Sequence, residues 1–176
     1  MTDLIETVGT HPHDSPHGSI LVKDRFLYLC TSNGVDAAHK FIPEPEAPSL
    51  VAFDKLTGKL VAVDGENMGP RTVHCTWSSP SYGAVAGKGL ICFGGGDGVV
   101  YAFEPLDTAT DYEEPAILKR AWRFDCDPTA PKENVHRYIR NRRESPSNIK
   151  SMPVFHDGRL YVTVGGDIWW GKREAW

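Results

Sequence analysis

The chain has little net charge, no long apolar run and no closely spaced pair of cysteines. Nineteen basic and twenty-three acidic side chains along 176 residues give a net charge of −4. This balance excludes the one-signed field that attracts nucleic acid or an anionic membrane. No apolar run approaches the roughly 18 residues that a membrane span requires. The composition therefore indicates neither a nucleic-acid-binding protein nor a membrane-spanning one.

Two further absences concern export and redox chemistry. Residues 1–6 contain no basic segment, apolar segment or small-residue cleavage site, so we expect this chain itself to carry no signal peptide. The cysteines at positions 30, 75, 92 and 126 are too far apart for a CxxC redox motif or a zinc ribbon. Cys30 and Cys92 lie inside apolar runs, which predicts buried thiols. The sequence leaves open whether Cys75 and Cys126 pair.

Glycine, proline and aromatic residues are plentiful. The chain holds 17 glycines and 13 prolines, and aromatic residues make up 10% of it. Many turn-forming residues together with many aromatics are typical of short strands joined by tight turns. The composition therefore predicts an all-β fold with almost no helix.

Three segments share one pattern, at residues 18–34, 78–98 and 150–167. Each has a small-residue start, a short strand, a tight polar turn, an aromatic-rich strand and a turn rich in Gly, Asn or Asp. The third contains Asp157-Gly158 between two apolar runs, which is a strong signal for a β-hairpin. Agreement between three copies indicates an internal repeat.

A second half-repeat follows the first two copies. Residues 49–62 form a strand, a turn closed by glycine and another strand, and residues 99–104 repeat the first of these strands. Its partner is expected at residues 121–124, after an insertion. Two hairpins per unit make four antiparallel strands, which is one blade of a β-propeller. We therefore predict one partial domain spanning residues 1–176, with about three four-stranded units, the last incomplete, at about residues 15–65, 76–126 and 148–176.

The motif Ala52-x-Asp54-x-x-Thr57-Gly58-Lys59 resembles the core of the repeat in PQQ-like (pyrroloquinoline-quinone, quinoprotein-type) β-propellers. The hairpin at residues 151–162, with its Asp-Gly-Arg-x-Tyr-Val sequence, is similar to the hairpin that precedes this core. The resemblance covers about residues 14–167. The chain departs from the family in having Ala62 or Val63 where the repeat normally has tryptophan. It also lacks the adjacent cysteine pair of the quinoprotein alcohol dehydrogenases.

The resemblance implies a parent protein that is exported to the bacterial periplasm and has six to eight blades. Because three units cannot close a propeller, we expect this chain to be a fragment, or one partner of an assembly that completes the ring. Its partners would be other propeller blades or another protein. We further expect the isolated chain to self-associate through its open edges and uncovered apolar faces.

Three histidines and an aspartate lie close together near the start of the chain. In an extended backbone His11 and His13 point to the same side, and His17 and Asp14 lie nearby. Imidazole donors at this spacing suit a borderline cation such as zinc. Two prolines in the same stretch equally favour a stiff loop in which polar side chains cap turns. His11, His13 and His17 are the candidate metal ligands, with a capping loop as the alternative.

The tryptophans are the candidate contacts for a planar cofactor. Trp77 and Trp169 present flat apolar faces on which a quinone would stack, and Trp122 and Trp170 share this property. Packing between blades is the alternative use of these side chains. The basic stretch at residues 135–143 is interpreted as a solvated insertion, and the glycine-rich stretch at 94–98 as a turn between strands.

Two functions therefore remain open. No Ser/His/Asp or Cys/His grouping has a recognisable nucleophile context, and the aspartates at repeat-equivalent turns are explained as caps: Asp54, Asp97, Asp157 and Asp167. The first function is a non-catalytic propeller that acts as a scaffold or presents its loops to a ligand or protein. The alternative is part of a PQQ-dependent alcohol or sugar dehydrogenase, in which calcium would accompany the quinone.

Overall fold

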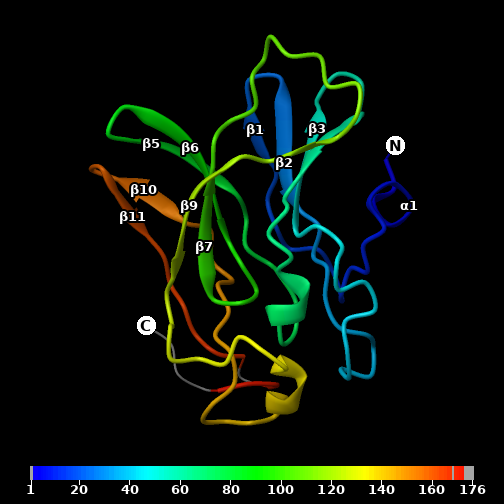
Figure 1. The fold of residues 1–176 in the computed structure, drawn as a ribbon, viewed down its shortest axis with the longest axis vertical. Coiled ribbons are helices and arrows are strands. Elements are labelled where there is room, and N and C mark those ends of the chain that lie inside the picture. The colour runs from blue at the N-terminus through cyan, green and yellow to red at the C-terminus, as the bar shows by residue number, and fades with distance from the viewer. Residues whose placement is uncertain (1, 168, 173–176) are drawn as a thin grey trace.

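The computed structural model describes residues 2–167 and 169–172, and it confirms the prediction of an all-β fold. The strands form three sheets, none of them closed into a barrel (Figure 1). In the described residues the one α-helix is α1 (Leu4–Val8), and two short 3-10 helices lie at η1 (Gly69–Arg71) and η2 (Val135–Tyr138). No helix among them has the length and apolar character that a membrane crossing requires.

The first sheet is an antiparallel meander with one added strand. Its order is β1-β2-β3-β4-β8, and β8 runs parallel to β4 whereas the other neighbours are antiparallel. The bounds are β1 (Leu21–Lys23), β2 (Phe26–Cys30), β3 (Leu50–Asp54), β4 (Leu60–Val63) and β8 (Ala116–Ile117). Strand β8 comes from the insertion that follows the second copy of the repeat, so this insertion reaches back to the first sheet.

The second sheet repeats the meander, in the order β5-β6-β7-β9. The bounds are β5 (Ser81–Val85), β6 (Lys88–Gly94), β7 (Val99–Phe103) and β9 (Arg120–Asp125). Strand β9 pairs antiparallel with β7, which confirms the partner strand expected at residues 121–124. The third sheet is the hairpin of β10 (Val154–His156) and β11 (Arg159–Tyr161), joined through Asp157-Gly158. The predicted third unit extends over residues 168 and 173–176, which lie outside the described residues.

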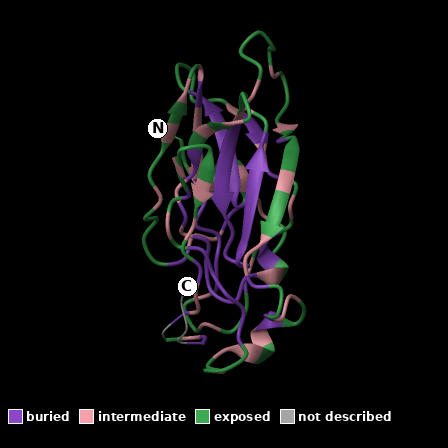
Figure 2. Cartoon of the chain, turned by 90° about the vertical axis from the view of Figure 1, so that its left-hand side faces the viewer, coloured by how far each residue is buried: buried purple, intermediate pink, exposed green. Residues whose placement is uncertain are grey.

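The sheets pack face to face through apolar side chains. One core cluster joins the first sheet to the second, and Figure 2 shows the buried strands at the centre of the molecule. Every residue of β3 and of β7 is buried, because both faces of these strands are covered. A smaller cluster joins the other face of the second sheet to the hairpin. The main cluster includes Phe26, Tyr28, Leu50, Ala52, Ile91, Phe93, Tyr101 and Phe103.

Aspartates close the turns between strands. Asp54 Oδ1 accepts hydrogen bonds from the amides of Leu56 and Thr57, while Oδ2 accepts from Arg25 Nε. The bond from Arg25 holds the pKa of Asp54 well below its usual range. Asp97 and Asp167 accept from the amide two residues further on, so the predicted capping role of these three residues is confirmed. Asp157 has a positive φ of 47° in the hairpin turn.

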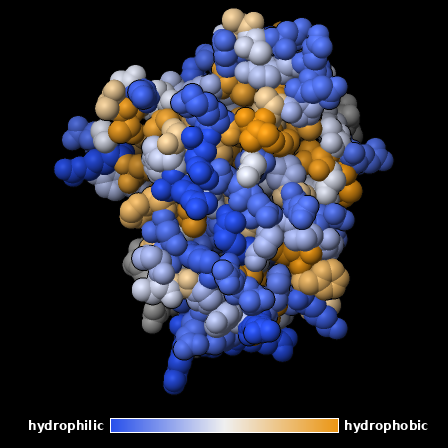
Figure 3. Space-filling model, viewed as in Figure 1, coloured by the Kyte–Doolittle hydropathy of each residue, from blue (hydrophilic) through white to orange (hydrophobic). Residues whose placement is uncertain are grey.

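The connecting segments at one end of the sheets gather into a single region, which we call the loop end. It comprises the segments before β1, after β2, β4, β6 and β9, and after β11, and apart from α1 it lies mainly in the lower half of the molecule in Figure 1. Antiparallel meanders place these connections at the same end of each sheet. On the face seen in Figure 3, hydrophobic residues lie in separate patches among hydrophilic ones.

Strand β5 lies beside both β1 and β10, so the first strands of the three sheets are neighbours. Gly83 in β5 permits this approach, because a Cβ there would lie 2.1 Å from Phe155 Cγ. We expect Gly83→Ala to destabilise the chain by about 1–3 kcal/mol through overpacking. In a Phe155→Ala background the same change should be neutral or slightly stabilising, since alanine loses less backbone entropy than glycine.

Urea unfolding of the four chains in this cycle measures the coupling. An equal cost of Gly83→Ala with and without the Phe155 ring would contradict the packing of β5 against β10.

Candidate functional site

Three imidazole rings meet at the loop end. His13 precedes β1, His39 lies between β2 and β3, and His74 lies between the first and second sheets. One potential ligand atom from each ring lies within 4.8 Å of the others. The ring centroids are 4.7 Å apart for His13 and His39, 4.7 Å for His13 and His74, and 5.1 Å for His39 and His74. We call these three residues the histidine cluster.

Backbone hydrogen bonds bring the three segments that hold these histidines together. The amide of His13 donates to the Ser32 carbonyl at 3.0 Å, and the amide of Val35 donates to the His74 carbonyl at 2.9 Å. The segment after β2 thus lies between the other two. Gly34 is at the crossing, where a Cβ would lie 2.8 Å from both His13 Cβ and the His74 carbonyl oxygen. Only glycine lets the three backbones come this close.

A compact turn positions His39. The Asp36 carboxylate accepts hydrogen bonds from the amides of Lys40 and Phe41, at 2.7 and 3.2 Å, and the His39 amide donates to the Asp36 carbonyl. His39 itself has a positive φ of 55°. Its ring stacks on Trp170, with centroids 4.0 Å apart and an interplanar angle of 14°. His39 is half-buried, whereas His13 and His74 are buried.

Hydrogen bonds fix the tautomers of the two buried rings. His13 Nδ1 lies 2.7 Å from the Val35 carbonyl oxygen, and His74 Nδ1 lies 2.8 Å from Asp167 Oδ2. Both partners are acceptors, so each Nδ1 carries the proton and each neutral ring leaves Nε2 with a lone pair. The two Nε2 atoms are 3.0 Å apart. Two lone pairs this close repel each other unless a proton or a metal ion lies between them.

Asp167 is the anionic support of this pair. Its Oδ2 accepts from His74 and from Lys150 Nζ at 3.0 Å, and its Oδ1 accepts from the amides of Trp169 and Trp170. Burial by itself raises the pKa of Asp167, but the hydrogen bonds from His74, the Trp170 amide and Lys150 outweigh it and hold this pKa well below its usual range. Asp167 is therefore a buried carboxylate that stays charged.

Burial acts differently on His13. It lowers the pKa of the ring, and only part of this effect is offset by the hydrogen bond to the Val35 carbonyl. The neutral, metal-binding form of His13 is therefore favoured at neutral pH. The exposed carboxylate of Asp14 adds a fourth donor, because its Oδ2 lies 3.3 Å from His13 Nε2.

Aromatic and cationic side chains surround the histidine cluster. Trp77 packs perpendicular to His74, with centroids 4.8 Å apart, and Lys150 Nζ lies 5.0 Å from the centre of the Trp77 ring. Arg140 lies over the Trp170 ring at 5.1 Å. Arg140 belongs to the basic stretch at residues 135–143, which was predicted to be a solvated insertion. This stretch contains η2, and through Arg140 it contacts Trp170 beside the histidine cluster.

The structure brings only some of the predicted site residues to the histidine cluster. Of His11, His13 and His17, only His13 belongs to the histidine cluster; His11 is half-buried and His17 is exposed. Trp77 borders the cluster, whereas Trp169 is 71% exposed. All four cysteines are free, and Cys30, Cys75 and Cys92 are buried.

Sequence reasoning missed His39 and His74. His74 could have been found from the repeat, because it precedes the first strand of the second unit much as His13 precedes that of the first. No comparable signal marks His39, which lies within the insertion between β2 and β3. Its contact with the other rings depends on the fold of that insertion.

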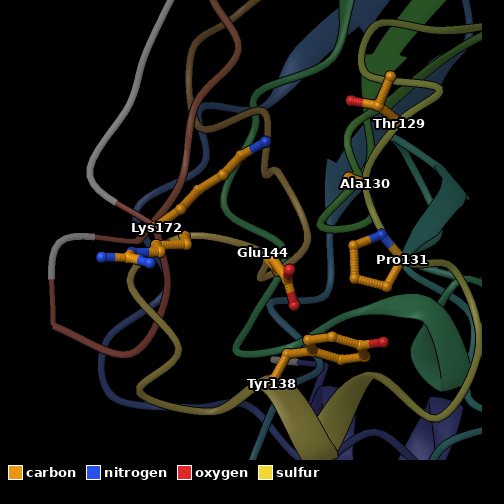
Figure 4. A pocket seen from close by; sticks show the side chains of 7 residues that line it. Thr129, Ala130, Pro131, Tyr138, Glu144 and Lys172 are labelled. Atoms are coloured by element: carbon orange, nitrogen blue, oxygen red, sulfur yellow. The ribbon is translucent and has the colours of Figure 1, made fainter.

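A separate polar pocket lies beside the loop after β9. It has a volume of about 620 Å³ and is lined by Thr129, Ala130, Pro131, Tyr138, Arg143, Glu144 and Lys172. Thr129, Ala130 and Pro131 lie on one side of it and Lys172 on the other, with Glu144 and Tyr138 between them (Figure 4). Lys172 forms an ion pair with the buried carboxylate of Asp127. The lining thus has charges of both signs and does not favour one class of ligand.

Comparison of the chain with protein-family models and with curated proteins gives no match to either. We therefore infer the chemistry of the site from its geometry alone. Three imidazole rings converge, the Asp14 carboxylate lies beside His13 Nε2, and the Asp167 carboxylate supports His74. Such an arrangement either shares a proton between two rings or coordinates a cation.

The assigned tautomers can be measured directly. Long-range ¹H–¹⁵N correlation NMR at mildly alkaline pH, with added chelator, should show His13 and His74 protonated at Nδ1 and unprotonated at Nε2. The exposed His17 serves as the internal control, because in water the Nε2-protonated form normally predominates. Protonation of His13 or His74 at Nε2 alone would contradict the hydrogen-bond assignment.

Proposed function

We propose that the chain supplies blades of a PQQ-like β-propeller that serves as a non-catalytic scaffold, with the loop end as its binding surface. The observation that carries this proposal is the repetition of one strand order in consecutive sheets that pack face to face. The first meander runs through β1, β2, β3 and β4, and the second through β5, β6, β7 and β9, with β8 inserted between β7 and β9 in the sequence. The first strand of the second sheet, β5, lies beside the first strands of the other two sheets, β1 and β10. This is the arrangement expected of propeller blades around an axis.

The open edges favour further blades or a protein partner as neighbours. Strand β11 pairs with β10 alone among the described strands. An apolar trough of about 570 Å³ lies between the second sheet and the hairpin, and it is lined mainly by Val100, Trp122, Phe124, Cys126, Leu160 and Val162. In a propeller this trough would be covered by the remaining strands of the adjacent blade. The family resemblance would place the parent protein among exported ones.

The surroundings of the tryptophans favour the scaffold over the PQQ-dependent dehydrogenase. Lys150 lies over the Trp77 ring and His74 packs perpendicular to it, so this ring already has partners within the chain. Trp169 is largely exposed, whereas a wall of a cofactor pocket is largely buried. The two candidate quinone contacts, Trp77 and Trp169, thus lie in different surroundings, which favours the scaffold.

Titration with PQQ and calcium, followed by tryptophan fluorescence, tests this proposal. We expect no saturable quenching at micromolar quinone and no dye reduction with alcohols or aldose sugars. Trp169→Phe is the matched control for Trp77→Phe, because it removes an exposed indole that has no ring partner within the cluster. Saturable quenching that a calcium chelator abolishes, and that Trp77→Phe removes but Trp169→Phe does not, would favour the dehydrogenase.

A further inference from the structure

We propose that the histidine cluster is a metal centre for a zinc-type divalent cation, with His13, His39 and His74 as nitrogen ligands and Asp14 as the oxygen ligand. The centre is independent of whether the parent protein binds a quinone. It would join three segments of the loop end through one ion.

The spacing of the donor atoms fits one ion. Ligands at zinc–nitrogen distances of about 2.0–2.1 Å in a tetrahedron lie about 3.3 Å from one another. His13 Nε2 lies 3.0 Å from His74 Nε2 and 3.3 Å from Asp14 Oδ2. His39 is the least buried of the three rings, and its donor atom lies within 4.8 Å of the other two. A shift of roughly 1.5 Å in this side chain would bring its nitrogen to the tetrahedral spacing.

A shared proton explains less of the geometry than a metal ion does. A proton between His13 and His74 would bridge two nitrogen atoms only. It would leave unexplained why a third imidazole packs against both rings and why a carboxylate oxygen approaches the same Nε2 atom. A divalent cation at the common centre accounts for all four donors.

The outer hydrogen bonds are those that metal-binding histidines generally have. A ligating imidazole usually donates its other N–H to a carboxylate or a backbone carbonyl, which orients the ring and increases its basicity. Asp167 does this for His74, and the Val35 carbonyl does it for His13. Lys150 and two amides in turn hold Asp167.

The donor set selects the class of metal. Imidazole nitrogen with a carboxylate suits zinc and neighbouring first-row transition ions, whereas calcium and magnesium prefer six or more oxygen ligands or octahedral oxygen sites. Four protein ligands leave no open position, which is typical of structural rather than catalytic zinc. We therefore assign the ion a structural role: it clips the segment before β1 to those that follow β2 and β4.

Zinc binding to the whole chain tests the assignment. After removal of metal with a chelator, isothermal titration with Zn²⁺ should give one ion per chain. His39→Phe should weaken binding at least about 100-fold, because it removes the donor nitrogen while keeping an aromatic ring to stack on Trp170. His17→Phe is the matched control and should bind zinc as the unaltered chain does. Asp167→Asn should weaken binding by about 10- to 100-fold.

Cobalt supplies a second readout that does not depend on affinity. Co²⁺ in the unaltered chain should give the intense visible absorption of a tetrahedral site, unchanged by added azide. Asp14→Ala should make this spectrum sensitive to azide, because it opens the fourth position. Far-UV circular dichroism establishes that each variant is folded.

Three results would overturn the proposal. One is the absence of micromolar zinc binding to the unaltered chain. Another is zinc binding that survives His39→Phe but is lost in His17→Phe, which would move the site to the N-terminal histidines. The third is a cobalt spectrum that responds to azide before Asp14 is changed, which would remove Asp14 from the ligand set.

Discussion

The arrangement of the molecule depends on the apolar interface between the first two sheets. Tyr28 and Leu50 of one sheet and Phe93 and Tyr101 of the other are fully buried in the same cluster. This contact aligns the two meanders, so the segments that leave them emerge at one end. Because those segments hold the polar and titratable residues of the site, hydrophobic packing determines which of them can meet. The loop end is thus a consequence of the core.

Within the loop end, close backbone approach at Gly34 replaces hydrophobic packing as the determining constraint. The segments around His13 and His74 pair with opposite sides of the chain at this residue. Burial makes polar groups without a hydrogen-bond partner costly. The Val35 carbonyl accepts a hydrogen bond from Nδ1 of His13, and Asp167 accepts one from Nδ1 of His74. The two Nε2 atoms, one on each ring, face each other 3.0 Å apart. A cation is the simplest way to satisfy them.

The sequence predicted the strands better than the site, for a physical reason. Alternation, turn residues and repetition are local signals, and they located β2, β7, the Asp157-Gly158 turn and even the late partner strand β9. The metal-like stretch was also visible, but spacing along one segment favoured His11 and His17, whereas the fold pairs His13 with rings 26 and 61 positions away. The capping role of Asp167 could be read from its turn; its hydrogen bond to His74 could not, since 93 residues separate them.

Anomalous X-ray diffraction at the zinc absorption edge, from crystals of the chain grown with zinc, determines whether the histidine cluster holds a metal ion. We expect one strong peak about 2.0–2.1 Å from a nitrogen of each of His13, His39 and His74, with Asp14 as the remaining ligand. A peak at His11, at His17 or at exposed carboxylates, with none inside the cluster, would contradict it. In that case the two buried imidazoles share a proton, and the histidine cluster is not a metal centre.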